Sequence, residues 1–170
     1  MRYDMVIIIS DKERDELLKS SKKPINKISS ITPKKKGGVK YKEFEIELFD
    51  IENRQYKIII RRNLIDQFDF SVLLRYFHRD AKIWRTLVRY NGCHIHVNKL
   101  EKQKIECFHI HKITEKYQKV DFREEGYAEL TKSYCSYDTA IKEFIKNNNI
   151  KEIPVIPQIT DWDAWQDGNK

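Results

Sequence analysis

A period-two alternation of apolar and polar residues limits the fold of this chain more than any other feature. Over residues 44–48, Phe, Ile and Leu alternate with glutamates, and the pattern resumes over residues 56–60 after a polar stretch at 50–55. Successive side chains of a β-strand point to opposite faces, so each run predicts a strand with one buried face. Two such runs joined by polar residues predict a β-hairpin.

Two longer segments, residues 70–79 and 82–91, predict a second hairpin with a tight turn between its strands. The alternation places Arg85, Leu87 and Arg89 on one face of the last strand, and aromatic and apolar residues on the other. We therefore expect a sheet with one apolar face and one partly cationic face.

Helical signals lie on both sides of these strands. Ser10 and Glu13 match a capping box and predict a helix over residues 11–19. Beyond the strands, residues 123–132 predict a short helix, and Ser136 begins a second one with apolar residues at helical spacing. The predicted fold class is α+β, an antiparallel sheet of about five or six strands flanked by an N-terminal helix and C-terminal helices.

The length of 170 residues suits one domain. Residues 20–40 are rich in Lys, Ser, Pro and Gly, a composition typical of a linker. We expect residues 1–40 to be an N-terminal helix and basic linker, and residues 41–150 to be a single α+β domain. Residues 151–170 are expected to be a flexible C-terminal tail.

The net charge of the chain is +7, from 33 Lys and Arg against 26 Asp and Glu, which favours RNA or another nucleic acid as a partner. Three cysteines without a CxxC motif indicate a reducing compartment, and the protein is expected to be cytoplasmic. No apolar run is long enough to span a membrane, so no membrane association is expected.

Four of the five histidines form two His-x-His pairs, His94 with His96 and His109 with His111. Each pair lies in a segment that is predicted to be a strand, where residues two apart share a face. We expect the two strands to pair as an antiparallel hairpin through the basic stretch 99–104, with His96 opposite His109. The four imidazoles would then share one patch.

Paired imidazoles beside cationic side chains suit the cleavage of RNA without a metal ion. One imidazole can take the proton of the 2'-hydroxyl as a general base while another protonates the leaving oxygen. The predicted catalytic residues are His94, His96, His109, His111 and Tyr117, the last as a further donor. The residues predicted to bind nucleic acid and stabilise the phosphorane are Arg75, Arg85, Arg89, Lys112 and Lys116.

Three alternatives stay open. The histidines, with Cys107, could bind zinc, although no Asp or Glu is expected on that face to orient them, so neither metal nor cofactor is predicted. The chain could be a non-catalytic inhibitory factor in phage–host conflict that binds a nucleic acid, a protein or a nucleoprotein. The histidines could also be surface residues without a special role. The absence of GxGxxG, Walker, HExxH and GxSxG motifs removes most support for nucleotide-cofactor enzymes and serine hydrolases.

Several segments carry a resemblance that covers roughly residues 40 to 150. They are LVRYNGCHIHVN at 87–98, FHIHK at 108–112, YAE at 127–129 and the segment 134–150. In layout these segments resemble an uncharacterised family of small prokaryotic proteins and, more distantly, the histidine-rich ribonuclease toxins of toxin–antitoxin systems. The resemblance implies a small α+β domain. It also suggests a toxin or host-defence role, with an antitoxin as a candidate protein partner.

Overall fold

A computed structural model describes residues 7–25, 30–36, 39–120 and 123–153. The three helices of this part are α1 (Asp11–Lys19), α2 (Glu115–Lys119) and α3 (Tyr137–Asn147). The strands are β1 (Lys22–Pro24), β2 (Ser30–Lys36), β3 (Val39–Asp50), β4 (Gln55–Asn63), β5 (Phe70–His78), β6 (Ile83–Asn91), β7 (His96–Asn98), β8 (Gln103–Ile105), β9 (His109–Lys112) and β10 (Ala128–Leu130).

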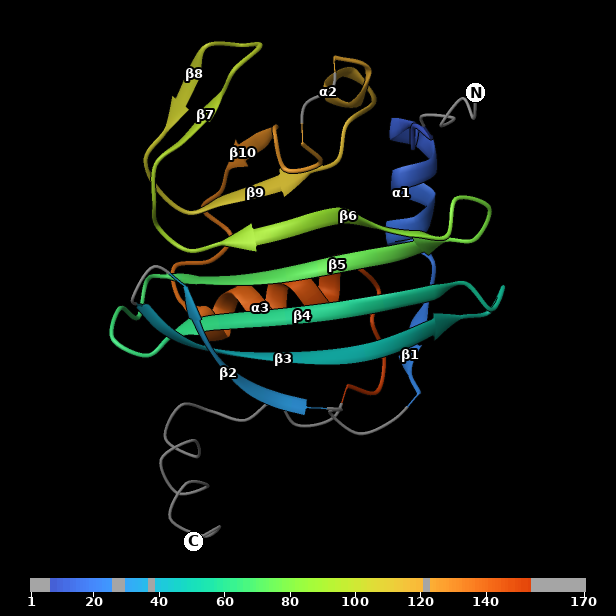
Figure 1. Cartoon of the computed structure of the whole chain (residues 1–170), viewed down its shortest axis with the longest axis horizontal. Helices are drawn as coiled ribbons and strands as arrows, with labels where there is room; N and C mark the ends of the chain where they lie inside the picture. The colour runs from blue at the N-terminus through green and yellow to red at the C-terminus, as the bar shows by residue number, and fades with distance from the viewer. Residues whose placement is uncertain (1–6, 26–29, 37–38, 121–122, 154–170) are drawn as a thin grey trace, which may run out of the picture.

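One antiparallel sheet dominates the fold, and α3 crosses behind it (Figure 1). Its strands follow the order β1-β3-β4-β5-β6-β9-β10, and β2 pairs with β3 beside β1. The predicted α+β class is therefore correct, and the described residues give this sheet eight strands instead of five or six. β7 and β8 form a separate two-stranded sheet.

The core lies between the sheet and α3. Alternate residues in the paired parts of β3, β4 and β5 face this layer, which is the consequence of the alternation seen in the sequence. Phe144 of α3 is 1 % exposed and packs edge-on against Tyr90 of β6, with ring centroids 5.3 Å apart. α3 begins at a capping box formed by Ser136 and Thr139, and α1 begins at the predicted cap, Ser10.

Two predictions about the flanking segments are wrong. Residues 20–40 are not simply a linker, because β1 and β2 lie in this stretch and pair with the free edge of β3. Residues 123–132 do not form a helix, because their strand β10 pairs with β9. Of the predicted tail at 151–170, residues 154–170 lie outside the described residues.

A β-bulge in β6 changes which side chains share a face. The register of β5 and β6 shifts after Leu74, which leaves Leu87 as an extra residue. As a result Arg85 lies on the same face as Tyr76 and the core, and Arg89 lies on the opposite face. The prediction that Arg85, Leu87 and Arg89 share a face is therefore wrong.

A fully buried lysine joins the two ends of the described chain. Lys22 of β1 is 0 % exposed, and its Nζ donates hydrogen bonds to the carbonyls of Leu18, Ser20 and Asn148 at 2.8–3.1 Å. The ammonium group also lies over the ring of Tyr56, 4.9 Å from its centroid. Burial lowers the pKa of Lys22 to about 7.

Candidate metal centre

The short strand β9 presents two histidines on the sheet face that is turned away from α3. His109 pairs with Asn91 of β6, and His111 pairs with Arg89. Between them, Ile110 points to the opposite face and packs against the core. Both imidazoles are buried. They are enclosed by β6, by β9 itself and by the segment that returns over them.

The other histidine pair reaches the same place by a sharp turn after β6. The turn occurs at Gly92, where an added Cβ would lie 1.7 Å from the carbonyl oxygen of Phe68. Only glycine can let the two backbones approach this closely. The chain then carries His94 and His96 back over β9, and His96 begins β7.

A buried asparagine fixes β7 and thereby His96. The Asn98 side chain donates to the carbonyl of Ala128 and accepts from its amide, both at 2.8 Å. Nε2 of His96 lies 3.1 Å from Oδ1 of Asn98 and 3.2 Å from the carbonyl oxygen of Gly126. Both of these oxygens are acceptors, so Nε2 of His96 carries a hydrogen.

The four imidazoles lie together as expected, but not through the predicted hairpin. β7 pairs with β8, whereas β9 pairs with β6 and β10. Ring centroids are 4.6 Å apart for His94 and His109, 4.6 Å for His96 and His111, and 4.8 Å for His109 and His111. The predicted pairing of His96 with His109 is wrong, because β9 fills the free edge of β6.

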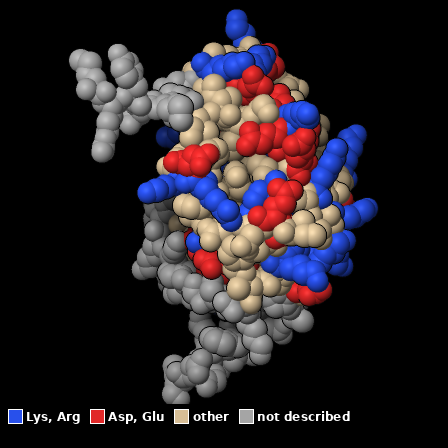
Figure 2. Space-filling view, turned by 90° about the vertical axis from the view of Figure 1, so that its right-hand side faces the viewer, with Lys and Arg blue, Asp and Glu red and all other residues tan. Residues whose placement is uncertain are grey.

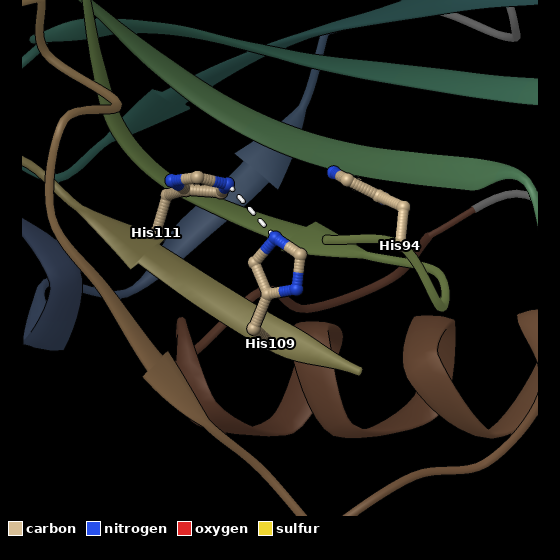
Figure 3. A group of neighbouring side chains, drawn as sticks. All are labelled: His94, His109 and His111. Atoms are coloured by element: carbon tan, nitrogen blue, oxygen red, sulfur yellow. Dashed lines mark hydrogen bonds between the residues drawn. The ribbon is translucent and has the colours of Figure 1, made fainter. Parts of the chain in front are cut away.

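The hydrogen bonds of His109 define its tautomer. Its Nδ1 lies 2.7 Å from the carbonyl oxygen of Cys107, which can only accept, so Nδ1 carries the hydrogen. The lone pair of neutral His109 is therefore on Nε2. This atom faces Nε2 of His111 at 3.1 Å (Figure 3). It also lies 3.3 Å from the side-chain amide nitrogen of Asn91.

Three imidazoles bring one ring nitrogen each into a small region of the structure. A ligand nitrogen from each of His94, His109 and His111 lies within 4.8 Å of the other two (Figure 3). Zinc–nitrogen bonds of about 2.0–2.1 Å would span the 3.1 Å between the Nε2 atoms of His109 and His111 at an angle of about 100°, close to tetrahedral. The spacing thus fits two ligands of one ion.

Burial keeps the two β9 imidazoles neutral. The pKa of His109 is lowered to about 4, mainly by burial and further by His94, His96 and Arg89. The pKa of His111 is lowered to about 3 by burial, with the neighbouring His109 as the next cause. Neutral imidazole is the form that binds metal ions.

A pocket of about 550 Å³ opens beside the cluster. Its walls include His94, His96 and His111, together with Arg89 and Arg123. A second pocket, of about 250 Å³, shares Arg89 and His94 with the first and is also lined by Arg61 and Arg62. The histidines therefore lie where two arginine-lined hollows meet.

The cationic residues predicted to bind nucleic acid are spread over the molecule, and of these five only Arg89 is among the residues lining the two pockets. The other four have partners elsewhere. Arg75 donates to the carbonyl of Trp84, and Arg85, Lys112 and Lys116 form ion pairs with Glu124, Glu129 and Glu101, respectively. Basic and acidic side chains are likewise interleaved on the end of the molecule drawn in Figure 2. Near the histidines, the described part of the chain thus offers the arginines that line the two pockets.

Tyr117 lines the larger pocket, but its side chain is 1 % exposed. Its hydroxyl donates to Glu101 and accepts from the amide of Leu100 at 3.2 Å. These contacts give Tyr117 a structural position at the pocket wall.

Sequence reasoning missed the acidic residue of the site. Glu125 lines the larger pocket, where its carboxylate forms an ion pair with Arg89 at 2.6 Å and so positions an arginine of the pocket. It arrives on the segment before β10, for which a helix was expected, and nothing local in the sequence indicates its place. Cys107 contributes its carbonyl to His109, and its thiol is not part of the three-histidine group.

No protein-family model, curated protein or solved structure matches the chain with significance. The resemblance to small prokaryotic proteins therefore stays a prediction. In the described part of the chain, the helices are too short or too polar to cross a membrane.

Proposed function

We propose that His94, His109 and His111 bind a divalent transition metal ion of the zinc class, and that the pocket beside them receives the substrate of a metal-dependent hydrolase. The observation that carries this proposal is the 3.1 Å approach of the Nε2 atoms of His109 and His111, with Nδ1 of His109 held by a carbonyl. Metal-binding histidines usually donate their other ring hydrogen in this way.

The donor set suits a catalytic site better than a structural one. Structural zinc sites use four protein ligands, whereas catalytic sites use three and leave a position for water or substrate. Three imidazoles converge here, and a pocket of about 550 Å³ adjoins them. A bound ion would supply a Lewis acid and lower the pKa of a bound water molecule.

The geometry favours this chemistry over the metal-independent scheme. A base and an acid must flank the phosphate, but the Nε2 atoms of His109 and His111 face each other at 3.1 Å and leave no room for one. A general acid also needs a pKa near the working pH, whereas burial lowers the pKa values of these residues to about 4 and 3. The same features favour metal ligands.

RNA is the substrate that we propose for the site. Arg89 and Arg123 line the larger pocket, and Arg61 and Arg62 line the smaller one, so arginines border both pockets that His94 shares. Arg89 is held by Glu125 and Arg61 by Glu43, which fixes these side chains at the pocket walls. Guanidinium groups are suited to phosphate because they offer paired donors and a permanent charge. A toxin or host-defence role, with an antitoxin or a nucleoprotein as partner, remains a prediction from the sequence.

Metal binding is tested by titrating the metal-free protein with Zn²⁺ and with Co²⁺, whose visible spectrum reports tetrahedral nitrogen ligands. One equivalent should bind to the wild type. His94→Ala should weaken binding at least tenfold without unfolding the protein, because this side chain is exposed. The matched control is His78→Ala, which removes the one histidine outside the four neighbouring imidazoles. Folded wild type that binds neither ion would overturn the proposal.

The substrate is tested separately by incubating a mixed RNA pool with zinc-loaded protein and with chelator. Cleavage should require the metal and be lost in the His94→Ala variant. Cleavage that persists in chelator would favour the acid–base scheme. A metal-loaded protein that binds RNA without cutting it would favour the inhibitory-factor alternative.

A further inference from the structure

Two of the three cysteines lie against each other beside the histidine cluster. The Sγ atoms of Cys93 and Cys107 are 3.9 Å apart, although the residues are separated by the whole β7–β8 hairpin. Cys93 is exposed and Cys107 is half-buried, so small oxidants can reach the pair. Cys135 takes no part in this contact.

We propose that Cys93 and Cys107 form a reversible disulfide when the protein meets a peroxide. A disulfide has an S–S bond of about 2.05 Å, and side-chain rotation can close the remaining gap between two thiols already in contact. Intracellular disulfides of this kind are typically transient and sense the redox state.

The chemistry balances with hydrogen peroxide as the oxidant. The thiol of the more exposed Cys93 gives up its proton, and its sulfur attacks one peroxide oxygen and becomes a sulfenic acid. The other oxygen leaves as hydroxide and takes up that proton to form water. The sulfur of Cys107 then attacks the sulfenic sulfur, which expels the second water. Two thiols lose two hydrogens, and one peroxide becomes two waters.

The position of the pair connects this modification to the proposed metal site. Cys93 directly precedes His94, and the carbonyl of Cys107 holds Nδ1 of His109. The cross-link would tie the turn that carries His94 to the residue that orients His109. This second step rests on the proposed metal site, and its expected result is slower release of Zn²⁺ from the oxidised protein.

Tryptic mapping under non-reducing conditions tests the disulfide itself. Lys99, Lys102 and Lys104 lie between the two cysteines, so cleavage separates the peptide 90–99, with Cys93, from the peptide 105–112, with Cys107. After peroxide treatment the full-length protein should yield these two peptides joined, lighter by two hydrogens. The peptide 133–142, which carries Cys135, should remain unlinked, and a reductant should reverse the linkage.

Matched variants make the test decisive. Cys135→Ser should keep the cross-link, and Cys93→Ser should abolish it and remain folded, because this side chain is exposed. The closed loop should raise the thermal unfolding midpoint of the oxidised wild type by roughly 5 °C. Linkage of Cys135 as readily as of Cys107, or no intramolecular linkage, would overturn the proposal.

Zinc release from oxidised and reduced wild type then tests the coupling to the cluster. Equal release rates would overturn the coupling and leave the mapped disulfide standing. A protein that binds no zinc yet forms the disulfide would refute the metal site alone.

Discussion

The two faces of the sheet are built in different ways. On the α3 face, alternate side chains of consecutive hairpins interlock with one helix, and many similar apolar contacts share the stabilisation. On the histidine face, segments from three parts of the chain meet, each fixed by a few specific contacts at Gly92, Asn98 and Cys107. On the α3 face, the packing is shared by many side chains, so the arrangement does not depend on a single hydrogen bond. On the histidine face, the loss of one specific contact should displace a histidine.

The largest expected effect is on the α3 face. Phe144→Ala removes a 1 % exposed ring and its contact with Tyr90, and we expect a loss of about 3–5 kcal/mol in the free energy of unfolding. Urea denaturation measures this. Ile51, which is 93 % exposed, supplies the control, since Ile51→Ala should change stability by less than about 0.5 kcal/mol. A similar loss of unfolding free energy in both variants would contradict the burial of Phe144 in the core.

The second expected effect belongs to the histidine face and depends on pH. An unfolded histidine has a pKa of about 6.5, and the folded pKa values of His109 and His111 are about 4 and about 3. As pH falls, the unfolded chain takes up protons first, so stability present above about pH 6.5 is lost towards pH 4. Between pH 7.0 and about pH 5.3 the metal-free protein should lose roughly 3 kcal/mol, about half of it from each histidine.

Urea denaturation in chelator at the two pH values checks this loss. Phe144→Ala should lose a similar further amount on acidification, because Phe144 packs against Tyr90 on the face of the sheet opposite to the two imidazoles. The control His78→Ala should retain the full pH dependence. A wild type with equal stability at both pH values would contradict the burial of the β9 imidazoles.

The third expected effect separates local geometry from global stability. Gly92→Ala forces the turn away from Phe68, because the added Cβ would lie 1.7 Å from its carbonyl oxygen. Displacement of His94 should weaken zinc binding by about 10- to 100-fold, comparable to the loss of an orienting contact. Isothermal titration measures the affinity, and circular dichroism should still report a folded sheet. Unchanged zinc affinity would remove His94 from the ligand set.

The smallest expected effect concerns charge. If RNA enters the pockets, Arg89→Gln should make the plot of log binding constant against log salt concentration less steep. The slope should change by about the amount that one phosphate contact contributes, because one counterion fewer is released. Arg75→Gln should leave the slope unchanged, since Arg75 contacts the carbonyl of Trp84 outside both pockets. Equal slopes for the two variants would contradict the assignment of the pockets to the nucleic acid.

The contrast between the faces also explains what could be predicted from the sequence. Alternation found β3 to β6 and their pairing as two hairpins, because a strand with one buried face must repeat every two residues. Local capping signals at Ser10 and Ser136 found α1 and α3. The bulge at Leu87 was missed, since one extra residue leaves the local pattern intact and reverses the faces only beyond it.

The histidine site was predictable in part. The two His-x-His pairs indicated a shared patch, and their rings do lie together. How they meet was not predictable, because β9 pairs with β6 and β10 through contacts distant in the sequence. Glu125 and Arg61 likewise reach the pockets only through tertiary structure.

The buried Lys22 has a consequence for the motions of the whole chain. Its ammonium group joins the end of α1 to the residue after α3, and its backbone bonds Asn149 and Lys151. If one end opened alone, the ammonium group would stay buried but lose some of its hydrogen-bond acceptors, which is costly. The first and last elements should therefore open as one cooperative unit. Amide hydrogens of α1 and of the last turn of α3 should then exchange with solvent at matching rates.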